Sequence, residues 1–163
     1  MMARRWVLWL AVLLLLAAGG APAAGMRPFD SGSMAAIRAA HAGRPFVLAF
    51  WSVHCEPCRE EMAHWGAWSR GHPGVRFVLV TTDEAVDREL AVSFLARQDL
   101  GRVESWAFAD PYVERLRWSV DPKWRGELPR AYFFDAGHRA EARSGRLDPR
   151  WVEAWLARQG AAR

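Results

Sequence analysis

The most informative stretch of the chain is Phe46-Val47-Leu48-Ala49-Phe50-Trp51-Ser52-Val53-His54-Cys55-Glu56-Pro57-Cys58-Arg59-Glu60-Glu61-Met62. Its first six residues are apolar in succession, a pattern typical of a strand that is covered on both faces. A short turn follows, and then Cys55 and Cys58, the only cysteines of the chain, open a helix. One helical turn brings both sulfurs within disulfide distance. A Cys-x-x-Cys at a strand-to-helix junction indicates a redox-active pair.

Length and composition indicate one compact domain with an N-terminal extension, since the chain has 163 residues of which 52% are hydrophobic. The charged fraction of 25% excludes disordered and fibrous classes. The formal charge is +4, and Lys123 is the only lysine among the basic residues. The arginines are scattered and alternate with acids, whereas a nucleic-acid binder would cluster them on one face. We therefore expect no nucleic-acid partner.

The N-terminus has the pattern of an export signal. Two arginines precede an uncharged run from Trp6 to Ala18, and an Ala-x-Ala site ends at Ala23. This predicts a signal peptide at residues 1–23. The alternative is an uncleaved inner-membrane anchor formed by residues 6–24. Both place the domain outside the cytoplasm, in the periplasm or an equivalent compartment, where disulfides persist.

Residues 24–32 are small, polar or rich in Pro and Gly, and we interpret them as a linker before a domain at residues 33–160. Apolar periodicity and Gly or Pro breaks predict the elements of that domain. The expected helices start at Ser33, at the cysteine pair, near Val86 and after Asp148, with a helical turn after Asp110 and strands at 46–51, 75–81, 106–109, 131–134 and 139–144. Alternating strands and helices followed by a hairpin predict an α/β sandwich with a central mixed sheet flanked by helices on both faces.

The chemistry expected of the pair follows from its position at a helix start. Free backbone N–H groups and the positive end of the helix dipole favour a thiolate at Cys55, which makes it the attacking group. Cys58 lies one turn further in and would resolve the mixed disulfide. Pro57 suits the first helical turn. Glu56 should oppose thiolate formation, so we expect a less oxidising site than one with a basic residue there. No cofactor is expected beyond the Cys55–Cys58 disulfide.

Other uses of the cysteines are weaker. A purely structural disulfide closing so short a loop would stabilise little. A structural zinc site needs about four ligands, and no second Cys-x-x-Cys exists. His54 and His64 keep a copper or Cys₂His site open, so a periplasmic metal chaperone is the alternative function. A binding module with vestigial cysteines is a third possibility.

Two stretches carry a family resemblance: residues 50–62 around the pair, and Glu127-Leu128-Pro129-Arg130-Ala131-Tyr132-Phe133-Phe134-Asp135. They resemble the TlpA/ResA/CcmG group of exported thioredoxin-like proteins, and the likeness extends over roughly residues 30–160. The resemblance implies a thioredoxin-like sandwich. It also implies an extracytoplasmic thiol-disulfide oxidoreductase that reduces protein disulfides, for example in the maturation of cytochrome c or copper proteins. A membrane-bound thiol reductase would be its electron donor.

By the same resemblance, Pro129 is a cis proline that faces the cysteine pair, and the Leu128 backbone pairs with a substrate segment as in strand addition. Glu61 would tune the pair and shuttle a proton. Two positions depart from the family. His54 replaces the usual tryptophan before the first cysteine, where it could stabilise the thiolate, supply a proton or face solvent. Ala49 stands where cytoplasmic thioredoxins keep a buried aspartate, which leaves Glu61 as the candidate substitute.

Overall fold

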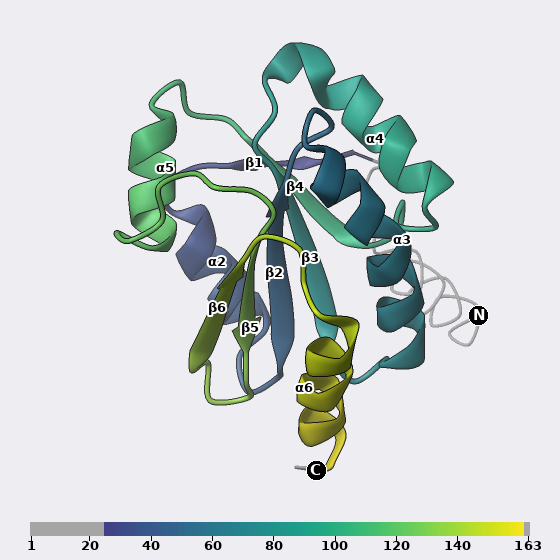
Figure 1. Cartoon of the computed structure of the whole chain (residues 1–163). Coiled ribbons are helices and arrows are strands. Elements are labelled where there is room, and N and C mark those ends of the chain that lie inside the picture. The colour runs from purple at the N-terminus through teal and green to yellow at the C-terminus, as the bar shows by residue number, and fades with distance from the viewer. Residues whose placement is uncertain (1–24, 162–163) are drawn as a thin grey trace, which may run out of the picture.

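The computed structural model describes residues 25–161 (Figure 1). The elements in chain order are β1 (Arg27–Phe29), α2 (Ser33–Ala40), β2 (Phe46–Trp51), α3 (Glu56–Gly71), β3 (Arg76–Thr81), the 3₁₀ turn η1 (Ala85–Asp87), α4 (Arg88–Arg97), β4 (Glu104–Phe108), α5 (Val113–Val120), β5 (Arg130–Phe134), β6 (Ala140–Ser144) and α6 (Pro149–Ala161). This order confirms the predicted alternation of strands and helices followed by a hairpin and a helix.

A single mixed sheet with the strand order β1-β4-β3-β2-β5-β6 forms the centre of the domain. The first four strands in this order are mutually parallel, and β5 and β6 are antiparallel to their neighbours. Strand β2 therefore lies between β3 and β5. Its carboxyl end, which leads to Cys55, opens at the same edge of the sheet as the carboxyl end of β3 (Figure 1).

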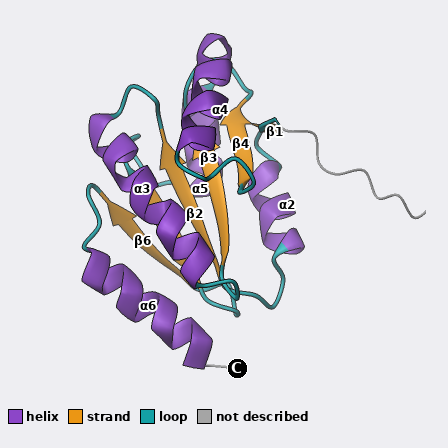
Figure 2. Cartoon of the chain, turned by 90° about the vertical axis from the view of Figure 1, so that its right-hand side faces the viewer, coloured by secondary structure: helices purple, strands orange, loops and turns teal. Residues whose placement is uncertain are grey.

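Both faces of the sheet are covered, as the unbroken apolar run of β2 predicts. The side chains of Val47, Ala49 and Trp51 pack into one apolar cluster with residues of α3, α4 and α6. Those of Phe46, Leu48 and Phe50 point the other way, into a cluster with residues of α2 and α5. Figure 2 shows α3 and α6 on one side of the sheet and α2 on the other. Because successive side chains of β2 point to opposite faces of the sheet, this one strand contributes to both apolar clusters.

The segment predicted as a linker differs from the prediction. Residues 27–29 form β1, which pairs in parallel with the edge of β4 and places Phe29 opposite Phe108. Phe29 is fully buried and its ring stacks on Phe108 at 5.5 Å. So short a strand forms because it pairs with β4 and buries the ring of Phe29. The composition of residues 24–32 does not reveal either contact.

Smaller differences concern element ends. Ser33, which the sequence pattern indicates as the cap of this helix, is instead the first residue of α2; its hydroxyl donates to the Asp30 carboxylate at 2.9 Å, and Gly32 takes the capping position. The helical turn expected after Asp110 is a two-turn helix, α5.

No helix among residues 25–161 is long and apolar enough to cross a membrane. The signal peptide or anchor predicted at residues 1–23 lies outside the described residues.

The central position of β2 leads to a stability prediction. Leu48 is fully buried on the middle of the sheet, whereas Leu90 on α4 is 48% exposed. We expect Leu48→Ala to lower the free energy of unfolding by about 2–5 kcal/mol, because it leaves a cavity between sheet and helices. The matched control Leu90→Ala should change it by no more than about 0.5 kcal/mol. Urea denaturation followed by tryptophan fluorescence measures both, and equal losses would contradict this assignment of the core.

Candidate active site

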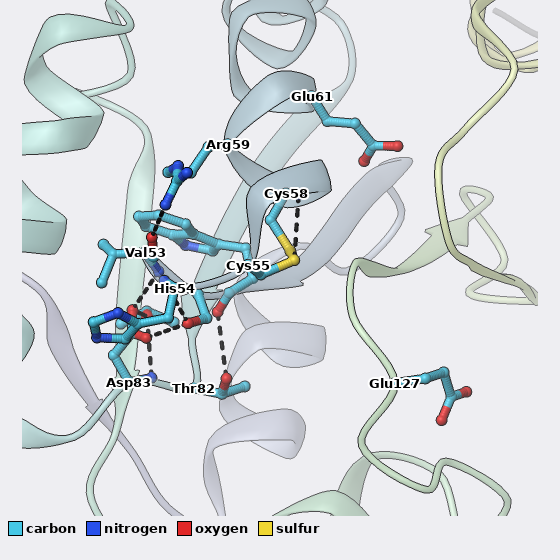
Figure 3. Close-up of a disulfide and its surroundings, with 12 residues drawn as sticks. Val53, His54, Cys55, Cys58, Arg59, Glu61, Thr82, Asp83 and Glu127 are labelled. Atoms are coloured by element: carbon cyan, nitrogen blue, oxygen red, sulfur yellow. Dashed lines mark hydrogen bonds between the residues drawn. A yellow bond between two sulfur atoms is a disulfide. The ribbon is translucent and has the colours of Figure 1, made fainter.

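The two cysteines form a disulfide at the start of α3, with their Cα atoms 5.2 Å apart (Figure 3). Cys55 is the N-cap residue of the helix, and its sulfur accepts a hydrogen bond from the backbone N–H of Cys58 at 3.3 Å. A free N–H group of the first helical turn thus points at the Cys55 sulfur. In the reduced protein the same donor, together with the helix dipole, would stabilise a thiolate there.

Access to the two sulfurs is unequal. Cys58 is fully buried within the apolar cluster under α3, and Cys55 is only partly buried. Cys55 is therefore the more accessible of the two sulfurs, and Cys58 is shielded behind it. This asymmetry suits the predicted division into an attacking and a resolving cysteine.

Glu61, one turn further along α3, is buried with 4% of its surface exposed. Its carboxylate accepts a hydrogen bond from the Leu147 backbone N–H at 2.5 Å. Burial raises the pKa of Glu61 to about 7, and the bond from Leu147 only partly offsets this. The neighbouring Glu60 is exposed and pairs with Arg146. Glu61 is therefore buried whereas Glu60 is solvated, and a pKa of about 7 lets Glu61 both take up and release a proton near neutral pH.

His54 turns away from the pair. In Figure 3 its ring points away from the two sulfur atoms. The ring Nε2 lies 2.9 Å from the Asp87 carboxylate. This bond and the charge of Asp87 raise the pKa of His54, although the side chain is 65% exposed. In this orientation the ring is directed at Asp87 and not at either cysteine sulfur.

The turn that joins β2 to Cys55 is held by a residue that sequence reasoning missed. Asp83, just after β3, accepts a hydrogen bond from the Val53 backbone N–H at 2.9 Å and another from the Ser52 hydroxyl. On the other side of the turn, Arg59 donates to the Val53 carbonyl at 2.7 Å. An acidic residue directly after a buried strand that neighbours β2 was the available signal, because parallel strands end at one edge of the sheet.

The second stretch of the family resemblance lies beside the end of β2. The register of β5 pairs Arg130 with Phe50, which puts Pro129 level with Trp51. The Leu128–Pro129 peptide bond is cis, as the resemblance implies, and Pro129 is buried. Leu128 is partly buried and, like Cys55, packs against the apolar cluster under α3.

Arg130 anchors the loop that carries these residues. Its guanidinium group, 12% exposed, donates to Asp121 at 2.8 Å and to Ser144 at 2.6 Å. Ser144 in turn donates to Glu127 at 2.9 Å. Both ends of the loop 121–129 are thereby tied to the β5–β6 hairpin. No local sequence pattern signals this network, because its bonded partners are 9 to 17 residues apart in the chain.

The ligands of the alternative metal site are not gathered around the sulfurs. His64 is exposed on α3, with its ring stacked on Trp68 at 5.7 Å. In the part of the chain that the structure describes, no group of three or more His, Cys, Asp or Glu side chains could hold a metal ion. Glu56 is exposed in the first turn of α3.

Comparison with known proteins bears on the fold. No family model and no curated protein matches the chain. Among solved structures, a secreted disulfide oxidoreductase of Mycobacterium tuberculosis, homologous to E. coli DsbE, matches with a TM-score of 0.60 at 21% identity, over 74% of this chain and 85% of that one. DsbF of the same organism matches with a TM-score of 0.61 at 22% identity, over 74% and 84%. The chain has a thioredoxin-like fold.

A secreted thiol-disulfide isomerase from Corynebacterium glutamicum also matches, with a TM-score of 0.58 at 18% identity, over 74% of this chain and 73% of that one. The fold implied by the sequence resemblance is therefore confirmed. The structures that share it include secreted thiol-disulfide oxidoreductases, in line with the TlpA/ResA/CcmG resemblance.

The raised pKa of Glu61 predicts an unusual pH dependence of stability. Between pH 4.5, the ordinary pKa of a glutamate, and about pH 7, folded Glu61 holds a proton that the unfolded chain has released. The free energy of unfolding should therefore be highest below this window and fall, by up to about 3 kcal/mol, as pH rises through it. Glu61→Gln keeps an acceptor for Leu147 and should lack this fall. Urea denaturation at pH 5 and pH 8 tests this against Glu60→Gln, and parallel profiles of wild type and Glu61→Gln would contradict it.

Proposed function

We propose that this chain is an extracytoplasmic thiol-disulfide oxidoreductase that reduces disulfides of protein substrates. The observation that carries the proposal is the placement of the pair. A partly exposed Cys55 sulfur receives the Cys58 N–H at the N-terminus of α3, and a fully buried Cys58 lies behind it. The thioredoxin-like fold supports it, because structures that share the fold are named as secreted oxidoreductases and isomerases.

In the first step the Cys55 thiolate attacks one sulfur of a substrate disulfide. The substrate S–S bond breaks, a mixed disulfide to Cys55 forms, and the released substrate sulfur takes up a proton. In the second step Cys58 loses its proton and attacks the Cys55 sulfur. The second substrate thiol leaves, and the Cys55–Cys58 disulfide closes. Two electrons and two protons have then passed to the substrate.

Glu61 is the proposed acceptor for the Cys58 proton. It lies one turn beyond Cys58 on α3, and its pKa of about 7 matches proton uptake near neutral pH. Leu128 offers backbone groups for a substrate segment to pair with, next to the buried Pro129. The disulfide itself is the only redox group required, so no further cofactor takes part.

The proposal that the pair acts as a reductant is argued from the charge of Glu56. Glu56 lies next to Cys55 and disfavours its thiolate, which shifts the pair toward the disulfide and makes the dithiol the better reductant. A membrane-bound thiol reductase would return electrons to the pair. Thiols of apocytochrome c or of copper-binding proteins are the proposed substrates. Export by residues 1–23 places this chemistry in the periplasm.

The division of labour between the cysteines predicts opposite trapping behaviour. Cys58→Ser should accumulate a mixed disulfide between Cys55 and a substrate protein, because the resolving thiol is missing. Cys55→Ser should accumulate none. Non-reducing electrophoresis with and without dithiothreitol measures this. Trapping by Cys55→Ser alone, or sulfurs that stay unreactive in the folded, reduced protein, would overturn the proposal. Stoichiometric metal in the purified protein that disappears in Cys55→Ser would favour the metal-chaperone alternative instead.

The direction of transfer predicts a low reduction potential. Equilibration in glutathione buffers, with alkylation to count free thiols, should give a value near that of thioredoxin, about −270 mV. A value near −120 mV, typical of a strong oxidant, would leave the exchange chemistry intact but reverse its direction.

A further inference from the structure

Asp83 is a buried carboxylate that the proposed reaction does not use. Only 7% of its surface is exposed, and it lies just beyond the end of β3 (Figure 3). It accepts hydrogen bonds from the Val53 backbone N–H at 2.9 Å and from the hydroxyls of Ser52 and Thr81. All three partners donate, which is the pattern that an ionised carboxylate satisfies. Among the described residues no cation forms an ion pair with it.

These bonds fix the backbone that delivers Cys55. The Ser52 hydroxyl, bound to Asp83, accepts from the His54 N–H at 3.0 Å. The Ser52 carbonyl accepts from the Cys55 N–H at 3.2 Å. Removal of Asp83 would leave the Ser52 and Val53 donors without their partner inside the protein.

The charge of Asp83 also reaches the active site. It adds to the rise in the pKa of His54, after the larger contributions of the bond to Asp87 and the charge of Asp87. His54 and Cys55 follow directly on Ser52 and Val53, the two residues that are hydrogen-bonded to Asp83. Burial weakens screening by solvent and salt.

Both basic and acidic side chains lie around Cys55 besides Asp83. His54 and Arg59 are the basic ones, and His54 is paired with Asp87. Glu56 is exposed beside Cys55, Glu61 is buried on the side of Cys58, and Glu127 lies across from the disulfide in Figure 3. Asp83 and Glu61 are the two acidic residues that are buried among residues 25–161. Of these two buried acids, only Asp83 is bonded to the turn before Cys55.

We propose that Asp83 is a positioning residue of the redox pair: it clamps the turn Ser52–His54 that holds Cys55 at the helix end, and its buried charge disfavours the Cys55 thiolate. The proposal rests on the proposed function, in which Cys55 attacks. It assigns Asp83 two separable effects. The clamp speeds closure of the Cys55–Cys58 disulfide, and the charge sets the pH at which Cys55 becomes reactive.

The charge effect is tested by alkylation of Cys55 with iodoacetamide in a Cys58→Ser background, where only one thiol remains. Asp83→Asn removes the charge and keeps an acceptor for Val53. It should move the midpoint of the pH–rate profile down by roughly one unit. The control Glu84→Gln removes the same charge from the exposed neighbouring residue and should move it by less than about 0.2 units, since solvent screens that position. An unmoved or raised midpoint in Asp83→Asn, or an equal shift in Glu84→Gln, would overturn the charge effect.

The clamp is tested without disturbing the buried charge, which also covers the case in which Asp83→Asn does not fold. Ser52→Ala removes the hydroxyl that links Asp83 to the His54 N–H. Stopped-flow measurement of ring closure from a Cys55–glutathione mixed disulfide should show a rate roughly five- to tenfold lower than wild type, because the two sulfurs are less well aligned. Its alkylation midpoint should not fall. A wild-type closure rate would overturn the clamp.

The outcomes also separate this inference from the proposed function. If wild-type Cys55 exchanges with disulfides while both variants behave like wild type, Asp83 has no positioning role and the oxidoreductase assignment stands. If wild-type Cys55 does not react at all, the proposed function itself fails.

Discussion

The hydrogen bond from the Cys58 N–H to the Cys55 sulfur is the interaction on which the site depends. It exists because Cys55 ends an extended segment and caps α3, with backbone dihedrals of φ −94° and ψ 103°. The elements on either side hold this strand-to-helix junction in place. Strand β2 is buried on both faces, and α3 is anchored by Met62 and Trp65, each 1% exposed. The packing of these two elements holds the Cys55 sulfur at the helix end, where the backbone donor points at it.

Two buried acids flank the pair and differ in what they can do. Cytoplasmic thioredoxins carry a buried aspartate on the strand position that Ala49 fills here. Glu61 has one backbone donor, so desolvation dominates and its pKa lies near neutrality. Asp83 accepts hydrogen bonds from three donors, two of which belong to the turn before Cys55. A carboxyl group with a pKa near neutrality suits proton transfer, whereas one held by several hydrogen bonds to a turn suits positioning.

The sequence predicts those elements whose signals lie within a few neighbouring residues. The apolar run of β2, the Gly and Pro breaks after α3 and the turn between β5 and β6 all signal their elements within a few residues, and the spacing of Cys55 and Cys58 signals the chemistry. Contacts across the sheet join residues that are far apart in the chain, and no local pattern predicts them. Asp83 meets Val53 from 30 residues away, and β1 is a strand only because β4 lies beside it. The roles of Glu61 and Pro129 came from resemblance and not from pattern.

His54 shows how one substitution changes the electrostatics of such a site. Where the TlpA/ResA/CcmG group that the sequence resembles usually has a tryptophan, this chain has an imidazole bonded to Asp87, and this bond raises the pKa of His54. That imidazole is adjacent in sequence to Cys55, and Asp83 is bonded to the same turn. Under the proposal, Asp83 disfavours a Cys55 thiolate, whereas a protonated His54 favours it. Deprotonation of His54 as the pH rises therefore removes a positive charge from the turn that leads to Cys55.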